Sequence, residues 1–144
     1  MEIKKILQSE KASAMHFVWN VFLEFEAPDY VDEGINTFHD FINNEEAVNG
    51  LEIYGTYEKE NLVGIIATRN NGNHIALFFV HGKYHRQGIG RKLFETVLKN
   101  STSKIITVNS SPYAIEIYHK LGFMDSDIEQ TKEGIRFTPM KYQK

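Results

Sequence analysis

Hydrophobic residues recur along this chain with two different periods, and each period predicts one kind of secondary structure. In the middle of the chain, runs rich in β-branched and aromatic residues alternate with short polar turns, which is typical of consecutive antiparallel strands. Asn71-Gly72 is typical of a tight hairpin turn, and Glu60-Asn61 marks another turn. We therefore expect a meander of strands at Leu51–Lys59, Leu62–Arg69 and His74–His81.

A 3.6-residue period predicts a helix before this meander. Ser9 is expected to cap that helix, and Pro28 ends it. Between Glu24 and Ile42 the sequence is acidic and aromatic, which indicates a loop followed by a short helix from Asp32. A first short strand is expected at Ile3–Leu7, and the apolar helix positions include Met15, Val18, Trp19, Phe22 and Phe25.

The segment from Leu77 to Leu93, LFFVHGKYHRQGIGRKL, is the most informative stretch of the chain. An apolar strand leads into a basic, glycine-containing turn, and the turn opens a helix that runs to about Asn100. The first N–H groups of a helix have no partner within it, and the positive helix end favours an anion. The glycines let the backbone approach a ligand closely, so this turn predicts a phosphate site.

A second informative pattern is ITVNSSPYAIEIYHKLGF, from Ile105 to Phe123. A strand rich in β-branched residues, expected at Lys104–Asn109, precedes Ser111-Pro112, a serine helix cap with proline at the first helical position. The helix is expected to end at Gly122. Its apolar face carries Ala114, Ile115, Tyr118 and Leu121, and a final pair of strands is expected around Phe123 and Ile135–Tyr142.

Together these two segments resemble the GNAT superfamily of acyl-CoA-dependent N-acetyltransferases. The family's pyrophosphate loop reads Gln/Arg-x-x-Gly-x-Gly/Ala, and here it reads His85-Arg86-Gln87-Gly88-Ile89-Gly90. The second signature is an Asn/Ser-x-x-Ala-x-x-x-Tyr helix that closes with Lys-x-Gly-Phe, matched here from Ser111 to Tyr118 and from Lys120 to Phe123. His85 and Ser111 replace the residues usual in the family, but neither change removes a backbone donor. The resemblance spans essentially the whole chain.

The resemblance implies an α/β (α+β) fold in one domain, residues 1–144. It implies a mixed, mostly antiparallel sheet of about six to seven strands splayed into a V, with about four flanking helices and acetyl-CoA as cosubstrate. Backbone groups of Phe78, Phe79 and Val80 would pair with the pantetheine arm, and one of their N–H groups would polarise the thioester carbonyl. Further acetyl-CoA contacts are implied for His85, Arg86, Gln87, Gly88, Ile89, Gly90, Arg91, Ser111 and Tyr118.

Tyr118 matches the family's general acid, which protonates the departing thiolate of CoA. A phenol with an ordinary pKa of about 10 stays protonated at neutral pH and can serve a thiolate with an ordinary pKa of about 8.5. The alternative is a core aromatic residue on the apolar face of its helix. The register, seven residues after Ser111 and five before Phe123, favours the general acid.

The acceptor amine arrives as an ammonium, so a base is needed. Many family members carry a glutamate on the strand before the tyrosine helix, whereas residues 105–108 here are Ile-Ile-Thr-Val. In another subgroup a glutamate stands eleven residues before the loop motif, a register that His74 occupies. A histidine with an ordinary pKa of about 6.5 can accept a proton, although a solvated residue after the hairpin turn is an equal alternative for His74.

In the family, the segment that follows the first helix folds over the acceptor site. Its carboxylates here are weaker candidate bases, and they are also suited to hold a cationic acceptor through charge-assisted hydrogen bonds. The candidate bases are Glu24, Glu26 and Glu33, and the expected acceptor contacts are Glu26, Tyr30 and Glu33.

Composition excludes several classes of protein. No apolar run approaches the ~20 residues of a membrane span, and a net charge of −3 argues against general nucleic-acid binding. The chain has no cysteine and no histidine pair with helical metal-ligand spacing, so we expect no disulfide, thiol nucleophile or metal site. Because the start of the sequence has no apolar signal region, a cytoplasmic location is expected. The protein is expected to be a monomer or a homodimer.

Two classes of function remain. The leading hypothesis is an enzyme that transfers acetyl from acetyl-CoA to a primary amine, on a small molecule or a peptide, by direct attack. The alternative is a non-catalytic module of the same fold that binds an acyl-CoA as a regulatory ligand, for which Tyr118 would be unnecessary. A nucleotide-binding protein is disfavoured because no Gly-Lys-Ser/Thr follows the loop and the third glycine of the dinucleotide motif is missing.

Overall fold

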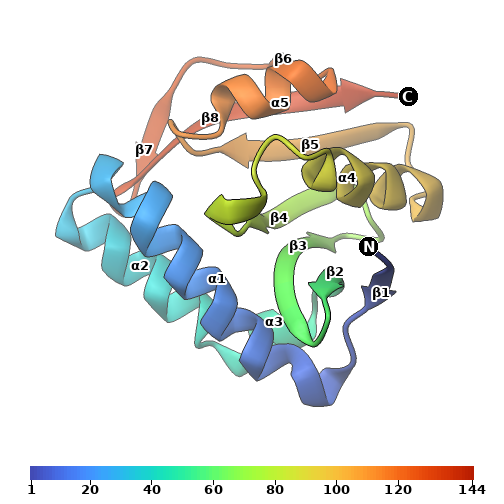
Figure 1. Cartoon of the computed structure of the whole chain (residues 1–144). Coiled ribbons are helices and arrows are strands. Elements are labelled where there is room, and N and C mark those ends of the chain that lie inside the picture. Colours follow the sequence, from blue (N-terminus) through green and yellow to red (C-terminus); the bar gives the residue numbers. More distant parts are fainter.

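The computed structural model describes the whole chain, Met1–Lys144, as one eight-stranded sheet with helices on both faces (Figure 1). The strand order is β1-β2-β3-β4-β5-β8-β6, and β7 pairs with β8. All neighbouring strands are antiparallel except β4 and β5, which are parallel. The strands are β1 (Ile3–Lys5), β2 (Glu52–Glu58), β3 (Asn61–Arg69), β4 (His74–Val80), β5 (Ile105–Ser110), β6 (Met124–Asp125), β7 (Gln130–Lys132) and β8 (Ile135–Gln143).

This architecture confirms the expected mixed α/β fold (α+β) with a mostly antiparallel sheet. The short strand β6 lies where a strand around Phe123 was expected, and the additional strand is β7, which at three residues is too short to show an alternating pattern in sequence. None of the helices combines the length and apolar character needed to cross a bilayer. The helices are α1 (Lys11–Phe25), α2 (Asp32–Ile42), α3 (Glu45–Asn49), α4 (Ile89–Asn100) and α5 (Ile115–Leu121).

Two local predictions need correction. Ser9 lies in the 3₁₀ turn η1 (Gln8–Glu10) and caps no helix, since α1 begins after that turn without a side-chain cap. The connection between β3 and β4 is longer than a two-residue turn, because positive φ angles extend over Asn70, Asn71 and Gly72. Asparagine tolerates this left-handed conformation better than most residues, so the polar cluster was read correctly as a turn but not as a short one.

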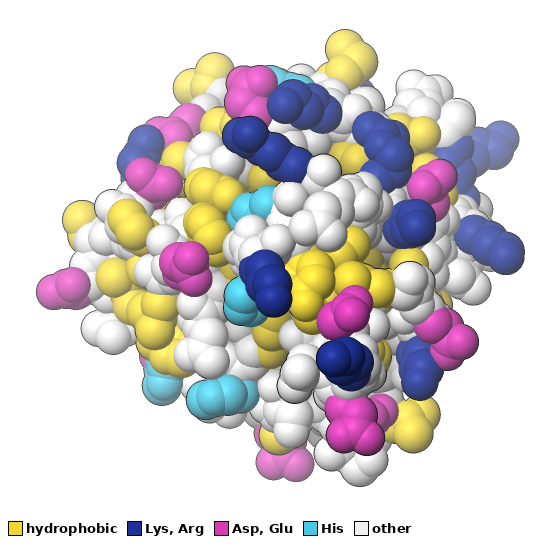
Figure 2. All heavy atoms as spheres, viewed as in Figure 1, with side chains coloured by type: hydrophobic (Ala, Val, Ile, Leu, Met, Phe, Trp, Pro, Cys, Tyr) yellow, Lys and Arg dark blue, Asp and Glu magenta, His cyan; other side chains and the backbone are white.

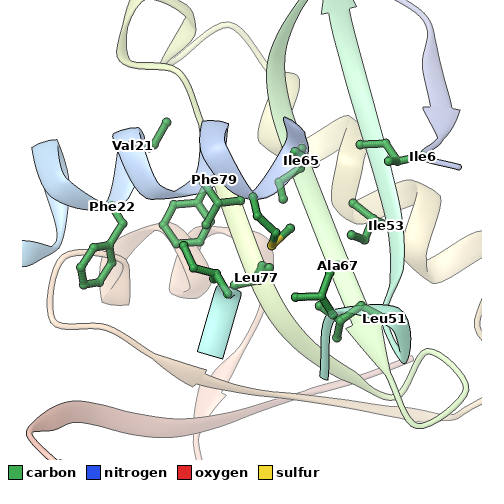
Figure 3. Packing of buried hydrophobic residues seen from close by; sticks show 14 of the residues in the cluster. Ile6, Val21, Phe22, Leu51, Ile53, Ile65, Ala67, Leu77 and Phe79 are labelled. Carbon is green, nitrogen blue, oxygen red and sulfur yellow. The ribbon is translucent and has the colours of Figure 1, made fainter. Parts of the chain in front are cut away.

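Two hydrophobic cores lie on opposite faces of the sheet. The first packs α1, α2 and α3 against the sheet, and Figure 3 shows Phe22 of α1, Ile65 of β3 and Phe79 of β4 gathered along α1. The second core packs α4 and α5 against the other face and includes Leu93 and Phe94, whose side chains are almost completely buried. Because burying such a side chain contributes about 1.5–3 kcal/mol, both helical layers are fixed firmly to the sheet.

A β-bulge in β4 explains why the sheet splays. Ala67 of β3 pairs with Leu77 and the next residue pairs with Ile75, so Ala76 has no partner. The extra residue places Ile75 in the second core and Leu77 in the first. Strand β5 pairs with β4 only at His74 and Ile75, before the bulge. Beyond it the two strands separate, which confirms the expected V.

The segment from the end of α1 through α2 is fastened to the β7–β8 hairpin, which it approaches at the left of Figure 1. A Cβ on Gly34 of α2 would overlap the backbone carbonyl of Gly134 in that hairpin, so the two backbones are in direct contact. The Thr37 hydroxyl donates to the Glu133 carbonyl oxygen at 2.7 Å. The β7–β8 hairpin therefore holds α2 in place beside the V.

Candidate active site

The arms of the V are β4 and β5, and the space beside β4 past the bulge is called the slot here. The His81 N–H donates to the Val63 carbonyl oxygen at 2.8 Å, which sets the phase of pairing with β3. Since hydrogen-bonded positions alternate, the backbone groups of Phe79 point to β3, and those of Phe78 and Val80 point into the slot. Two of the three residues predicted to pair with pantetheine, Phe78 and Val80, therefore direct their backbone groups into the slot.

The N-terminus of α4 has the geometry that an anion cradle requires, and residues 88–91 are called the cradle here. Gly88 is the N-cap with φ of 80°, and its carbonyl oxygen accepts a hydrogen bond from the Lys92 N–H at 3.1 Å. The N–H groups of Ile89 to Arg91 thus have no partner in the helix. A Cβ on Gly90 would lie 3.3 Å from the Phe78 ring, so the cradle adjoins the slot directly.

Side chains of the loop before α4 mostly hold the loop in place. His85 Nε2 lies 2.7 Å from the Val80 carbonyl oxygen, and Gln87 Nε2 donates to the Lys83 carbonyl oxygen at 3.1 Å. Arg91 Nη2 donates to the Lys120 carbonyl oxygen at the end of α5, at 3.0 Å. Arg86, with a positive φ of 64°, is exposed. Of the two loop arginines, Arg86 is therefore the one available to an anion.

Positive charge gathers over one part of the surface. Figure 2 shows Lys and Arg side chains over α4, β5 and β8, on the upper right of the view. Because the chain as a whole carries a net charge of −3, this concentration is local and favours approach of an anionic ligand. Exposed basic residues in or directly beside these elements include Lys92, Lys99, Lys104 and Lys141.

Tyr118 of α5 lies beside the slot. It is 5% exposed, and its ring centroid is 5.9 Å from that of Phe78 and 5.3 Å from that of Phe123. No protein group hydrogen-bonds its hydroxyl, and the hydroxyl oxygen is not completely sealed from solvent. Burial, and then the charge of Glu26, raise the pKa of Tyr118 above its ordinary value. Tyr118 therefore stays protonated at neutral pH and keeps a free proton to donate.

Ser111 lies in the turn between β5 and α5. Its hydroxyl oxygen accepts from the Ala114 N–H at 3.3 Å, which stabilises that turn. The helix itself begins later than predicted, at Ile115, with Ala114 as N-cap. The Ser111 side chain also lies close enough to the Glu26 carboxylate to lower the pKa of that group.

Glu26, at the C-cap of α1, has a strongly shifted pKa and also influences the pKa of several neighbouring groups. Burial is the largest cause that raises its pKa to about 7; the Asp29 charge adds to the rise and the nearby Ser111 side chain opposes it. Its charge acts in turn on the hydroxyls of Tyr30, Tyr113 and Tyr118. Of the predicted site residues, Tyr30, Ser111 and Tyr118 therefore lie within electrostatic reach of Glu26.

Tyr30 follows the 3₁₀ turn η2 (Ala27–Asp29). Its hydroxyl donates to the Arg136 carbonyl oxygen at 3.3 Å, and burial raises its pKa above the ordinary value. Glu24 is exposed, and a Cβ on Gly82 would lie 3.5 Å from its Oε1. Glu33 is exposed in the first turn of α2 and forms no ion pair.

His74 lies at the paired base of the V, next to Thr107 of β5. Its Nδ1 is 2.7 Å from the Thr107 hydroxyl oxygen. Burial, and secondly the Arg69 charge, lower the pKa of His74 to about 4. The imidazole is therefore neutral at pH 7 but is a weak proton acceptor. The structure pairs His74 with Thr107 and does not join it to the group around Tyr118.

Sequence reasoning did not assign a role to two aromatic residues at the site. The Phe25 ring centroid is 4.8 Å from that of His85 and 5.3 Å from that of Tyr113. Phe25 thereby touches the loop after β4 and the turn after β5. The available signals were the position of Phe25 beside an acidic residue and that of Tyr113 inside the second motif. No three histidine or acidic side chains gather closely enough to hold a metal ion.

Known proteins share this fold. The family model for an acetyltransferase (GNAT) domain matches residues 26–144. A GCN5-related N-acetyltransferase from Rhodopseudomonas palustris superimposes with a TM-score of 0.84 at 19% identity, covering 99% of this chain and 94% of that one. PaiA N-acetyltransferase from Thermoplasma acidophilum, in complex with coenzyme A, gives 0.77 at 17% identity, with 99% and 98% coverage.

An aminoglycoside 6′-N-acetyltransferase complexed with coenzyme A gives a TM-score of 0.64 at 12% identity, with 99% and 97% coverage. At these identities the structural likeness shows the fold alone. A search of curated protein sequences gives no match.

Proposed function

Because this chain belongs to the GNAT acetyltransferase family, we propose that it transfers the acetyl group of acetyl-CoA to a primary amine by direct attack. The observation that carries this proposal is the stretch Phe78–Val80, unpaired on the β5 side, with the anion cradle at its end and Tyr118 beside it. A binding site for a long ligand with a diphosphate needs these features in this order.

The residues present fit acetyl-CoA. The cradle offers backbone N–H groups to a diphosphate irrespective of side chain, and the open space beside Gly88 leaves room for it. The backbone groups of Phe78 and Val80 can pair with the amides of an extended arm, as a strand would. Acetyl-CoA supplies an activated acetyl group when it binds there.

The chain's own groups then favour acetyl transfer. An N–H of Phe78 or Val80 stabilises the negative charge that develops on the carbonyl oxygen, a type of contribution worth ~3–4 kcal/mol. Tyr118 gives its phenolic proton to the departing sulfur. Since the Tyr118 hydroxyl has no structural partner, its position favours an enzyme over the alternative, a module that only binds an acyl-CoA.

The acceptor is proposed as an amine on a small molecule or peptide. Carboxylates at the covered face of the V are compatible with a polyamine, an aminoglycoside, an amino acid or a protein lysine. Cytoplasmic location, the single-domain organisation and a monomeric or homodimeric state stay predictions, as does the expectation of no metal.

A panel of primary amines tests the proposal. Spermidine, kanamycin, free lysine and a lysine-containing peptide are each incubated with the protein and acetyl-CoA, and release of CoA thiol is followed. We expect amine-dependent release with at least one acceptor class. Acetyl-CoA that raises the melting temperature without any amine-dependent release would favour the regulatory module, because tight binding alone stabilises a protein by ~2.7 kcal/mol at a hundredfold excess over Kd.

A further inference from the structure

We infer that Glu26 takes the proton from the acceptor ammonium, and that the acceptor therefore enters as a cation at the junction of α1 and η2. The inference rests on the proposed function and adds the residue that prepares the nucleophile. Four observations carry it: the place of Glu26 between the arms of the V, its fixed backbone, its lack of a cation partner, and the tyrosine hydroxyls on which its charge acts.

The end of α1 lies between the two arms. Phe25 contacts His85, in the loop after β4, and Tyr113, in the turn after β5. A Cβ on Gly82 would lie 2.7 Å from the Phe25 ring, so no side chain intervenes on the β4 side. Glu26 is the next residue, and the Ser111 side chain on the β5 side lies close enough to lower its pKa. Its carboxylate is therefore placed where both arms converge on α1.

The backbone of Glu26 is held firmly. Its N–H donates to the Phe22 carbonyl oxygen at 2.9 Å, and its carbonyl oxygen accepts from the Asp29 N–H at 3.0 Å. These bonds join the last turn of α1 to η2. A half-buried side chain on such an anchor has few alternative positions, which suits a group that must meet a substrate atom.

No lysine, arginine or histidine forms an ion pair with Glu26. Half-buried carboxylates are normally paired with a cation, because burial disfavours an isolated charge. An ammonium entering from solvent would supply the missing partner. The site is therefore complementary to a cationic acceptor before any proton moves.

Titratable and polar groups on several neighbouring elements interact with Glu26. Asp29 of η2 and Ser111 of the β5–α5 turn act on it directly, and it acts on Tyr30, Tyr113 and Tyr118. Arg136 and Glu129 act on Tyr30, whereas Arg86 and Glu24 act on Tyr113. Burial dominates this balance and raises the pKa of Glu26 to about 7. A base is most effective when its pKa lies near the working pH.

The transfer balances as follows. The ammonium nitrogen gives one proton to a Glu26 carboxylate oxygen, and the neutral amine attacks the thioester carbonyl carbon. The C–S bond breaks with its electron pair on sulfur, sulfur takes the Tyr118 phenolic proton, and the Tyr118 oxygen takes the second proton from nitrogen. Glu26 then releases its proton to water. The products are the amide, CoA thiol and one proton.

The two residues are coupled by charge. Ionised Glu26 contributes to the raised pKa of Tyr118, so proton uptake by Glu26 removes part of the energy that holds the phenolic proton in place. Tyr118 thus becomes a better donor once the acceptor has lost its proton. The charge change at Glu26 therefore prepares both the nucleophile and the general acid.

Other candidate bases fit less well. His74 is bonded to Thr107 at the base of the V, and its lowered pKa makes it a weak acceptor of protons. Glu24 and Glu33 are exposed and are not joined to Tyr118 by charge or contact. Of these carboxylates, Glu26 alone acts on the general acid.

The test compares pH–rate profiles of wild type, Glu26→Gln and Glu26→Asp with acetyl-CoA and the fastest amine of the panel. We expect kcat/KM of Glu26→Gln to fall by about 10²–10⁴ near neutral pH, with loss of the limb governed by an apparent pKa of about 7. Glu26→Asp retains that limb at a lower rate. Acetyl-CoA affinity is unchanged in both variants. A purely structural role would lower the rate without removing the limb.

Glu60→Gln is the matched control, since Glu60 is exposed in the turn between β2 and β3 and carries the same charge. A Glu26→Gln profile that keeps its limb and a near-wild-type rate would overturn the inference. Wild-type protein that acetylates no amine would contradict the proposed function instead, and a readout without turnover then decides the assignment.

That readout is the unfolding midpoint of wild type relative to Glu26→Gln. The folded-state pKa of Glu26 is raised above its ordinary value of 4.5, so ionising this group in the folded state costs stability. Wild type is expected to lose stability relative to the variant as pH rises from 4.5 through 7. A difference that stays constant over this range would show an ordinary carboxylate and overturn the inference.

Discussion

Tyr118 and Glu26 show how two side chains far apart in sequence form one chemical unit. The tyrosine lies on α5 and the glutamate ends α1, yet the charge of one acts on the proton of the other. The second motif predicted the position of Tyr118, because its register with Ser111 and Phe123 is local. The position of Glu26 between the arms depends on the contacts of its neighbour Phe25 with His85 and Tyr113, which no local pattern contains.

Removing the Tyr118 hydroxyl tests the role of the general acid. Tyr118→Phe keeps the ring that packs near Phe78 and Phe123, so the protein folds and acetyl-CoA affinity stays within a few-fold. Turnover falls by roughly 10²–10⁴, the usual contribution of general acid catalysis. Single-turnover kinetics measure the chemical step directly. An undiminished rate in that experiment would leave Tyr118 as a packing residue.

His74 gives a prediction that opposes the sequence-based expectation of its role as base. If Glu26 takes the proton, His74→Gln retains the acid limb of the rate profile. The His74 pKa is lowered from 6.5 to about 4 in the folded state, so its stabilising effect is present above pH 6.5 and is lost as pH falls toward 4. The melting temperature of wild type should therefore fall more over that pH range than the melting temperature of His74→Gln. Loss of the acid limb in this variant would restore His74 as the base.

At the level of secondary structure, one β-bulge and one helix N-terminus create the binding features. The sequence predicted the helix start within a residue, because glycines and a following amphipathic run mark it locally. The bulge at Ala76 was not predicted, since a period of two cannot show which residue lacks a partner across the sheet. For the same reason the sequence did not reveal that Phe79 directs its backbone to β3.

The cradle is tested by a pair of variants that differ in charge and little in size. Gly88 has a φ of 80° and open space beside it, and both Asn and Asp tolerate this conformation better than most residues. Gly88→Asp places a carboxylate where the diphosphate would bind, so acetyl-CoA affinity should be at least about tenfold weaker than for Gly88→Asn at low salt. Isothermal titration calorimetry measures both. Equal affinities would show that the diphosphate binds elsewhere.

At the level of the whole molecule, the sheet separates two faces with different charge. Basic residues gather over α4, β5 and β8 (Figure 2), whereas Glu26, which forms no ion pair, is the C-cap of α1, a helix that packs on the other face of the sheet. This separation suits a reaction in which an anionic cosubstrate and a cationic acceptor meet in the slot. Sequence reasoning predicted the fold class and most strands, because meander and helix patterns are local. It could not predict the anchoring of α2 on the β7–β8 hairpin, which depends on two glycines a hundred residues apart.

The most direct measurement is the fate of the acetyl group itself. Protein, amine and acetyl-CoA labelled with carbon-13 in the acetyl group are incubated together, and the mass of the amine is determined, with Tyr118→Phe as the control. The account predicts labelled acetyl-amine with wild type and far less with the variant. Label that stays on CoA, or appears only as free acetate, while acetyl-CoA is shown to bind, would contradict direct transfer to an amine.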